Sequence, residues 1–144
     1  MAKVATYLNF SNETEQAFLF YKSVFGGEFK TFQRFSDVPN LPGADKMKPE
    51  DKNGMMHIEL PILGGVHSLM GTDAPESMGF KINKGNNVYI SLDVDSKEEA
   101  DRLFNALSAG GKIEMGMADM FWGAYFGSFF DKFGVQWMIN YAKK

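Results

Sequence analysis

The sequence has no cysteine among its 144 residues, which excludes disulfide bonds, a thiolate nucleophile and a zinc site built on thiolates. It also lacks an apolar run near the ~20 residues of a membrane span, and its N-terminus carries no signal-peptide pattern. We therefore expect a cytoplasmic protein with no membrane partner. The net charge of −3 provides no dense basic face to neutralise phosphates, so nucleic acid is not an expected partner either.

Sequence motifs for common cofactor and nucleophile chemistry are missing too. The glycine pairs at 26–27, 64–65 and 110–111 lack the strand, GxGxxG and helix context of a dinucleotide site. There is no P-loop and no GxSxG nucleophile elbow. Aromatic residues, by contrast, are abundant, at 15% of the chain with 14 phenylalanines. A roomy aromatic pocket or an apolar subunit interface would use so many.

The chain repeats itself at an offset of 84 residues. Segments 6–28 and 90–112 share one order: a short alternating strand, a helix-capping box, an amphipathic helix and a Gly-Gly pair. The predicted capping boxes join Asn12 to Glu15 and Ser96 to Glu99. Apolar residues recur at helical spacing, and they are Ala17, Phe20, Tyr21 and Val24 in the first helix and Ala100, Leu103, Phe104 and Leu107 in the second.

Both halves of the repeat also end alike. Segments 64–70 and 133–139 each read as a tight turn entering a strand, at an offset of 69, and each follows another predicted strand, at 55–62 and 124–130. Each half therefore predicts the order βαβββ. The drop from 84 to 69 indicates about fifteen extra residues in the first half, placed in the loop 36–54. A loop of this length is typical of a lid or of a disordered segment.

Several segments resemble the vicinal-oxygen-chelate (glyoxalase/bleomycin-resistance) superfamily, and its PhnB-like branch in particular. They are the helix 17–26 (AFLFYKSVFG), the turn and strand 131–137 (DKFGVQW), Trp122-Gly123 and the start 7–10 (YLNF). Together, and in this order, they cover nearly the whole chain. Lys132 departs from the proline usual in the family, which affects the turn rather than the function.

The resemblance implies an α+β fold, in which two βαβββ modules form curved mixed sheets around a cup, with the helices on the outer face. The expected boundaries are 1–72 for the first module, 73–87 for a linker and 88–144 for the second module, within one structural domain. In this family two modules close the cavity within one chain or across a homodimer, and a homodimer is the implied partner. The fold hosts lyases, epimerases, dioxygenases, thiol transferases and non-catalytic drug-binding proteins, so function must be argued from the site.

The strand period of two predicts which side chains face the cup. Apolar residues alternate along 56–62 and 88–94 and should meet the helices, while the intervening polar residues face the cup. The offset of 69 adds His67 and Leu69 to this face. For the first strand, the helix offset selects Tyr7 and Asn9, whereas the family's ligand spacing selects Thr6. The expected ligand pocket comprises Tyr7, His57, Glu59, His67, Tyr89, Ser91, Trp122, Phe126, Gln136 and Met138.

Metal-using members resemble one another in having His, Gln or Glu at one position on the first and last strand of each module. Carried over to this sequence, those positions hold Thr6, Leu69, Tyr89 and Met138. None is a good ligand for a hard or borderline divalent ion, which prefers imidazole, carboxylate or thiolate donors. We therefore expect no cofactor and no usual metal centre.

His57 and Glu59 are the candidate catalytic residues, because two positions apart on one strand they project to the same side. Glu59 would orient His57 as a general base, with His67 reaching the same cavity. A polar edge of the cup explains the pair equally simply, and we favour it because no partner nucleophile or metal is evident. A divalent-metal site made by His57, Glu59 and His67 stays open as an alternative.

A methionine-rich segment, 115–120, is expected to form a loop that packs adaptably near aromatic side chains. Thioethers also bind Cu(I), but such a site usually recruits cysteine or histidine as well. Trp122 and Phe126 follow directly. They form either a stacking wall for a flat ligand or part of the core or a dimer interface.

The sequence thus favours a protein that binds a small hydrophobic or aromatic molecule, with no catalysis or only weak catalysis. The first alternative is a metal-dependent lyase or dioxygenase with an unusual site at His57, Glu59 and His67. The second is a dimeric interaction module whose aromatic residues seal the interface and bind no ligand.

Overall fold

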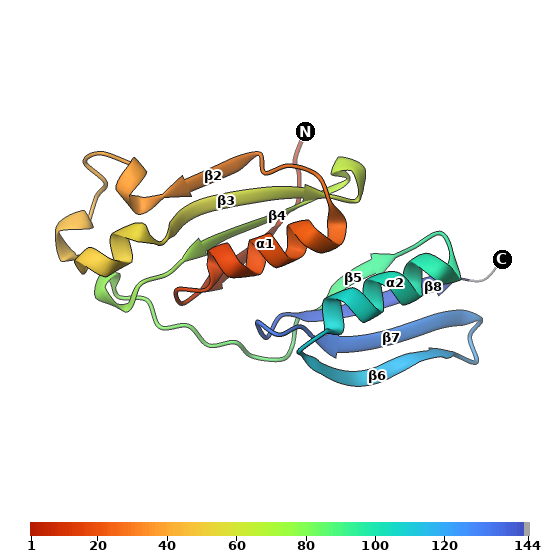
Figure 1. Cartoon of the computed structure of the whole chain (residues 1–144). Helices are drawn as coiled ribbons and strands as arrows, with labels where there is room; N and C mark the ends of the chain where they lie inside the picture. Colours follow the sequence, from red (N-terminus) through yellow and green to blue (C-terminus); the bar gives the residue numbers. More distant parts are fainter. Residues whose placement is uncertain (143–144) are drawn as a thin grey trace. The chain divides into compact units, whose positions relative to one another are not determined.

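The computed structural model describes residues 1–142, which divide into two compact units between Asn83 and Lys84. We call residues 1–83 unit 1 and the residues from 84 onward unit 2. Each unit consists of one strand, one long helix and three further strands (Figure 1). None of the helices in the described part of the chain is long and apolar enough to span a membrane.

Unit 1 builds a four-stranded sheet in the order β1-β4-β3-β2. The first strand runs parallel to the last, and the other neighbours are antiparallel. The elements in chain order are β1 (Thr6–Phe10), α1 (Thr14–Phe25), β2 (Thr31–Arg34), β3 (Met55–Ile62) and β4 (His67–Asp73).

Unit 2 repeats this topology in a second sheet with the order β5-β8-β7-β6, again with its first and last strands parallel. Its elements are β5 (Ile90–Asp93), α2 (Lys97–Ser108), β6 (Lys112–Asp119), β7 (Ala124–Phe130) and β8 (Gln136–Ala142). The predicted α+β fold of two βαβββ modules is therefore confirmed.

Each helix lies across one face of its own sheet (Figure 1), and in both units a glycine lets an aromatic ring of that helix come close. A Cβ on Gly71 of β4 would lie 2.6 Å from the ring of Phe18 in α1. Likewise, a Cβ on Gly127 of β7 would lie 2.9 Å from the ring of Phe104 in α2. Both rings are buried, so the two cores are built by the same kind of contact.

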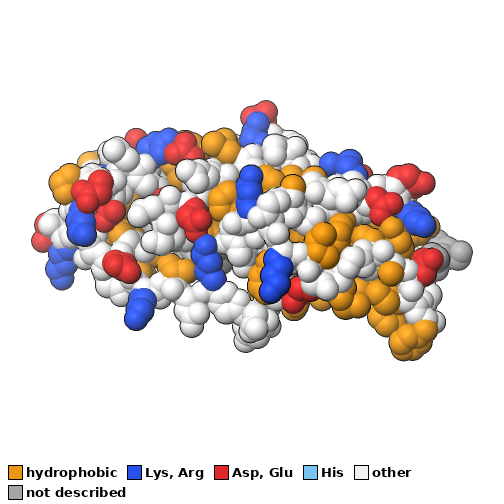
Figure 2. Space-filling model, turned by 60° about the horizontal axis from the view of Figure 1, so that its bottom comes forward, with side chains coloured by type: hydrophobic (Ala, Val, Ile, Leu, Met, Phe, Trp, Pro, Cys, Tyr) orange, Lys and Arg blue, Asp and Glu red, His pale blue; other side chains and the backbone are white. Residues whose placement is uncertain are grey.

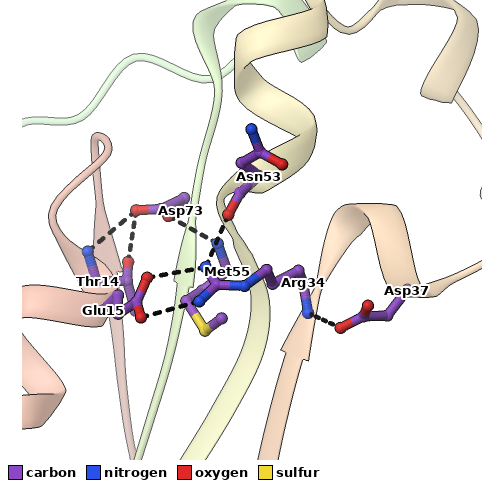
Figure 3. A network of polar contacts seen from close by, with 7 residues as sticks. All are labelled: Thr14, Glu15, Arg34, Asp37, Asn53, Met55 and Asp73. Carbon is purple, nitrogen blue, oxygen red and sulfur yellow. Dashed lines mark hydrogen bonds and ion pairs between the residues drawn. The ribbon is translucent and has the colours of Figure 1, made fainter.

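The two helices begin differently. Ser96 caps α2, accepting a hydrogen bond of 3.1 Å from the backbone N–H of Glu99, as predicted. The box predicted for Asn12 is wrong, because the residue before α1 is Glu13, whose side chain makes no capping hydrogen bond. Instead Asp73, at the end of β4, accepts from the backbone N–H of Thr14 (3.1 Å) and from its hydroxyl (2.7 Å) (Figure 3).

The predicted loop 36–54 is tied into unit 1 by short 3-10 helices and polar contacts. Within this loop the side chain of Met47 is buried, and so is that of Phe35, which directly precedes the loop. Arg34 donates to both carboxylate oxygens of Glu15 in α1, at 2.8 and 2.9 Å, and to the backbone carbonyl of Asn53 at 2.9 Å (Figure 3). Three such helices belong to this region, η1 (Phe35–Asp37), η2 (Ala44–Lys46) and η3 (Pro49–Asn53), and two more are η4 (Leu63–Gly65) and η5 (Glu76–Met78).

The methionine-rich segment is not a loop, because β6 continues through it to Asp119. The pairing of β6 with β7 is irregular at two places, between Ile113 and Met115 and between Met115 and Ala118. Each irregularity adds a residue to β6 that has no partner on β7. These interruptions, together with two glycine-flanking methionines, hide the strand period in the sequence.

Candidate functional site

The pairing register of unit 1 assigns each strand residue to one of two sheet faces. Cross-strand partners point to the same side of a sheet, and successive residues point to opposite sides. The row through Gly71 faces α1, because Phe18 packs there. The next row therefore lies on the face opposite the helix, and it consists of Thr31, Glu59, Met70 and Tyr7. We call this side of the sheet the polar face.

Three of the predicted pocket residues come together on the polar face. The Tyr7 hydroxyl lies 3.2 Å from Nδ1 of His57, and the two rings are stacked with centroids 5.7 Å apart. Partial burial raises the pKa of Tyr7 above its ordinary value, and a hydrogen bond with Thr72 opposes that rise. Ser68 donates a 2.8 Å hydrogen bond to the carboxylate of Glu59, which is only 8% exposed.

His67 and Leu69 lie on the opposite face, contrary to our expectation. Leu69 pairs with the buried Leu60, and His67 pairs with the buried Ile62. His67 hydrogen-bonds through Nε2 to the hydroxyl of Thr6 at 2.8 Å, and Thr6 pairs with Leu69. The helix offset, which selected Tyr7 for the first strand, agrees with this register.

His67 and Leu69 were expected on the wrong face because two turns differ in length. Four residues, 63–66, join β3 to β4, whereas five residues, 131–135, join β7 to β8. The true offset between the last strands is therefore 68 rather than 69, since Met70 pairs with Tyr7 as Met138 pairs with Ser91. A slip of one residue moves every side chain of a strand to the other face.

The register also corrects the positions at which metal ligands would stand. On the faces opposite the helices, the first and last strands hold Tyr7 and Met70 in unit 1 and Ser91 and Met138 in unit 2. This set does not fit a divalent ion that needs imidazole or carboxylate donors. Within residues 1–142, no group of three or more His, Asp or Glu side chains is placed to hold a metal ion.

In unit 2, the face opposite α2 combines apolar and polar side chains. One row consists of Met115, Ser128, Met138 and Ser91. The next row contains Phe126 and Asn140, and the Asn140 amide donates to Asp93 at 3.1 Å. Two predicted pocket residues are already engaged in structural contacts. Tyr89 donates to Glu114 at 2.8 Å, and the Gln136 side chain is buried, with its amide nitrogen, once the amide is flipped, donating to the carbonyl of Val88 at 3.2 Å.

Trp122 lies in the turn between β6 and β7, and its side chain is 57% exposed. It makes edge contacts with Phe121, at 5.0 Å between ring centroids, and with Phe126, at 6.4 Å. Phe121 itself is 98% exposed. Figure 2 shows hydrophobic side chains gathered over one side of unit 2. This turn is therefore an exposed aromatic cluster rather than a closed pocket wall within its unit.

A polar pocket of about 300 Å³ lies at the start of α1 and was not predicted from the sequence. Its carboxylates are largely occupied, because Asp73 holds Thr14 and also the backbone N–H of Met55 at 2.8 Å, while Glu15 holds Arg34. These bonds anchor the loop to the helix, so the pocket serves the fold. The lining residues are Asn12, Glu15, Gln16, Glu50, Asp51, Asn53, Gly54, Met55 and Asp73.

The chain is similar to proteins of known family. Residues 3–139 match the model of the Glyoxalase/Bleomycin resistance protein/Dioxygenase superfamily. Protein YjdN of Escherichia coli is 32% identical over 143 residues, covering 98% of this chain and 96% of its own. The crystal structure of protein PA1353 from Pseudomonas aeruginosa is 34% identical and covers all of both chains, with a TM-score of 0.84.

A solved PhnB protein from Bacillus cereus shares the fold, with a TM-score of 0.76, 24% identity and coverage of 98% of this chain and 100% of its own. The match of the family model over nearly the whole chain and the relatives above 30% identity agree with the strand order and register of both units. The chain belongs to the glyoxalase/bleomycin resistance protein/dioxygenase superfamily.

Proposed function

We propose that this chain is a small-molecule-binding member of the superfamily that works without the usual metal centre, and that the polar face of unit 1 contacts the ligand. The observation that carries the proposal is the donor set at the expected ligand positions. Tyr7, Met70, Ser91 and Met138 stand there, and thioethers and neutral hydroxyls do not match what hard divalent ions bind. A metal-dependent lyase or dioxygenase would need more carboxylate or imidazole donors on one face.

The polar face has the mixture of groups that small-molecule sites use. Ligand sites combine apolar and aromatic surface with a few placed polar groups. Here Tyr7 and His57 offer stacked rings, Met70 offers an adaptable thioether, and Glu59 and Ser68 offer a carboxylate and a hydroxyl. Because Tyr7 is 49% exposed, its ring is open to contact from outside the unit.

Thermal unfolding of chelator-stripped protein tests both parts of the proposal. We expect no rise in melting temperature with Ni, Zn, Mn, Fe(II) or Co added singly, and a rise with at least one compound of an aromatic library, because a ligand of the native state stabilises it by mass action. The rise should be lost in His57→Ala. The matched control is His67→Ala, since the chain's second histidine lies on the opposite face.

A saturable stabilisation by one metal ion that disappears in His57→Ala would overturn the metal-free proposal and favour the enzyme alternative. Stabilisation by a library compound that survives in His57→Ala would place the ligand elsewhere than on the polar face.

A dimeric interaction module is the second candidate function, and the exposure of Phe121 and Trp122 supports it. Exposed aromatic side chains at a turn are typical of interface anchors. Light scattering measures whether the particle has the mass of one 16.1 kDa chain or of two. If the turn forms the interface, Trp122→Ala shifts the equilibrium toward single chains, whereas a mass that Trp122→Ala leaves unchanged would contradict this role.

A further inference from the structure

The Glu59 carboxylate is unusual in its surroundings on the polar face. It is 8% exposed, and among the described residues the donor to it is the neutral hydroxyl of Ser68, at 2.8 Å. No ion pair of Glu59 is found within residues 1–142. A carboxylate withdrawn from water without a cationic partner is costly to the folded protein, and such a group favours any ligand that supplies the missing charge.

The rest of the polar face gives this carboxylate no competing cation. The rows opposite α1 between Gln33 and Ser68 contain no lysine or arginine, and Glu59 is their one acidic side chain. Arg34 follows a bulge in β2 and lies over the Phe32 ring, where it binds Glu15 of α1. The residues in these rows are Thr31, Gln33, His57, Glu59, Pro61, Ser68, Met70, Thr72, Tyr7 and Asn9. A ligand on this face therefore meets a single carboxylate, surrounded by hydroxyl and amide groups and by ring surface.

Aromatic surface lies beside the carboxylate. Tyr7 stands in the same cross-strand row as Glu59, with Met70 between them, and the His57 ring is two residues away along β3. The stacked rings of Tyr7 and His57 are inclined by only 22°, so together they present ring surface beside Glu59. Such surface attracts both flat rings and cations.

We propose that the polar face binds a small aromatic molecule that carries a protonated amine, with its ammonium donating to Glu59 and its ring lying against Tyr7 and His57. This inference rests on the proposed function and deepens it by naming the class of ligand. A hydrogen bond between an ammonium and a carboxylate is about twice as strong as one between neutral groups, so the charge of the ligand should decide its affinity.

Titrations with benzylamine, benzyl alcohol and benzoate, followed by amide NMR shifts, separate charge from shape, because the three probes share one ring. We expect saturable shifts around Glu59, Met70 and Tyr7 with benzylamine. The alcohol should bind at least about tenfold more weakly than the amine, a ratio equivalent to about 1.4 kcal/mol, and benzoate should not bind. Glu59→Gln, which keeps an acceptor for Ser68, should remove the preference for the amine.

The control variant is Glu114→Gln, because Glu114 is also a carboxylate held by a hydroxyl, that of Tyr89, but it is exposed and lies in unit 2. It should leave the amine preference intact. Equal binding of amine and alcohol on the polar face would overturn the amine proposal and leave the proposed function standing. The same holds if aromatic library compounds bind there but benzylamine does not. If neither the probes nor the library compounds shift the amide resonances of the polar face, both proposals fail.

Discussion

The two units follow the same chain path, yet the faces opposite their helices have different chemistry. In unit 1 this face holds the stacked rings of Tyr7 and His57 and the buried carboxylate of Glu59, whereas in unit 2 Met138 and Phe126 lie among serines and the hydrogen-bonded Asn140. The faces toward the helices are alike, since each sheet places a glycine under an aromatic ring. The comparison teaches that the helix-facing half of each module is constrained by the fold, while the other half is free to differ.

A second contrast concerns the Gly-Gly pairs that follow the helices. In unit 1, Gly27 has a positive φ of 80°, and a Cβ there would meet nothing closer than the carbonyl oxygen of Pro61 at 3.6 Å. In unit 2, a Cβ on Gly111 would overlap the carbonyl oxygen of Phe130 and lie 2.9 Å from the Cα of Asp131. The second glycine of the pair is thus required for backbone conformation in unit 1 and for space in unit 2, while the first glycine has a positive φ of 76° in both.

The largest loss of stability is expected from a substitution at Gly111. Gly111→Ala should lower the free energy of unfolding by about 3 kcal/mol, because backbone atoms cannot yield to the new methyl group. Gly27→Ala should cost about 1–2 kcal/mol for the left-handed conformation alone. Denaturant unfolding measures both, and tryptophan fluorescence reports unit 2 alone, since Trp122 and Trp137 both lie there. A larger loss in Gly27→Ala than in Gly111→Ala would contradict this account.

The helix starts provide the next test. Asp73→Ala should destabilise the protein by about 2–3 kcal/mol, because it removes charge-assisted bonds to Thr14 and Met55 from a buried site. The local cap of unit 2 should matter less, so Ser96→Ala should cost about 1 kcal/mol. Unfolding followed by circular dichroism measures both variants. Equal losses would indicate that the distant cap of α1 is worth no more than a local one.

An effect smaller than that of Asp73→Ala concerns a tyrosine that joins helix to sheet in unit 2. Tyr125 donates to Asp101 at 2.6 Å, and this hydrogen bond raises the pKa of Tyr125 to about 12 from an ordinary 10.0. The raised pKa stabilises the folded protein below pH 10, and the contribution disappears as pH rises from about 10 to about 12. Tyr125→Phe should therefore cost about 1–2 kcal/mol at neutral pH.

The pH dependence itself checks this prediction. The difference in unfolding free energy between the natural chain and Tyr125→Phe should shrink as pH rises through that window, because the natural chain alone loses the bond. A difference that stays constant through the window would show that Asp101 does not hold the proton of Tyr125.

Much of the fold was predictable because it depends on burial with a regular period. The buried set of α2, with Ala100, Leu103, Phe104 and Leu107, agrees with the helical spacing. In α1 the same spacing missed Phe18, which is fully buried although Phe20 is only partly so. The family membership followed from motifs spread over the chain.

The candidate site was predictable only in part, because faces depend on turn length. Tyr7, His57 and Glu59 share a face as the strand period indicates, but His67 was misplaced by the single extra residue in the turn of unit 2. The cap on Thr14 could not be foreseen either, because Asp73 lies 59 positions away along the chain. Such contacts are set by tertiary packing and leave no local pattern in the sequence.

The interrupted pairing of β6 has a consequence for solubility at high concentration. An outer strand of eight residues would ordinarily offer its free backbone groups to another chain and start fibrous aggregation. Two added residues twist this border, and Lys112, Glu114 and Asp119 place charges along it. The other outer strands, β1, β2 and β5, have only five, four and four residues. The exposed aromatic turn therefore follows an edge strand that resists pairing with other chains into fibres.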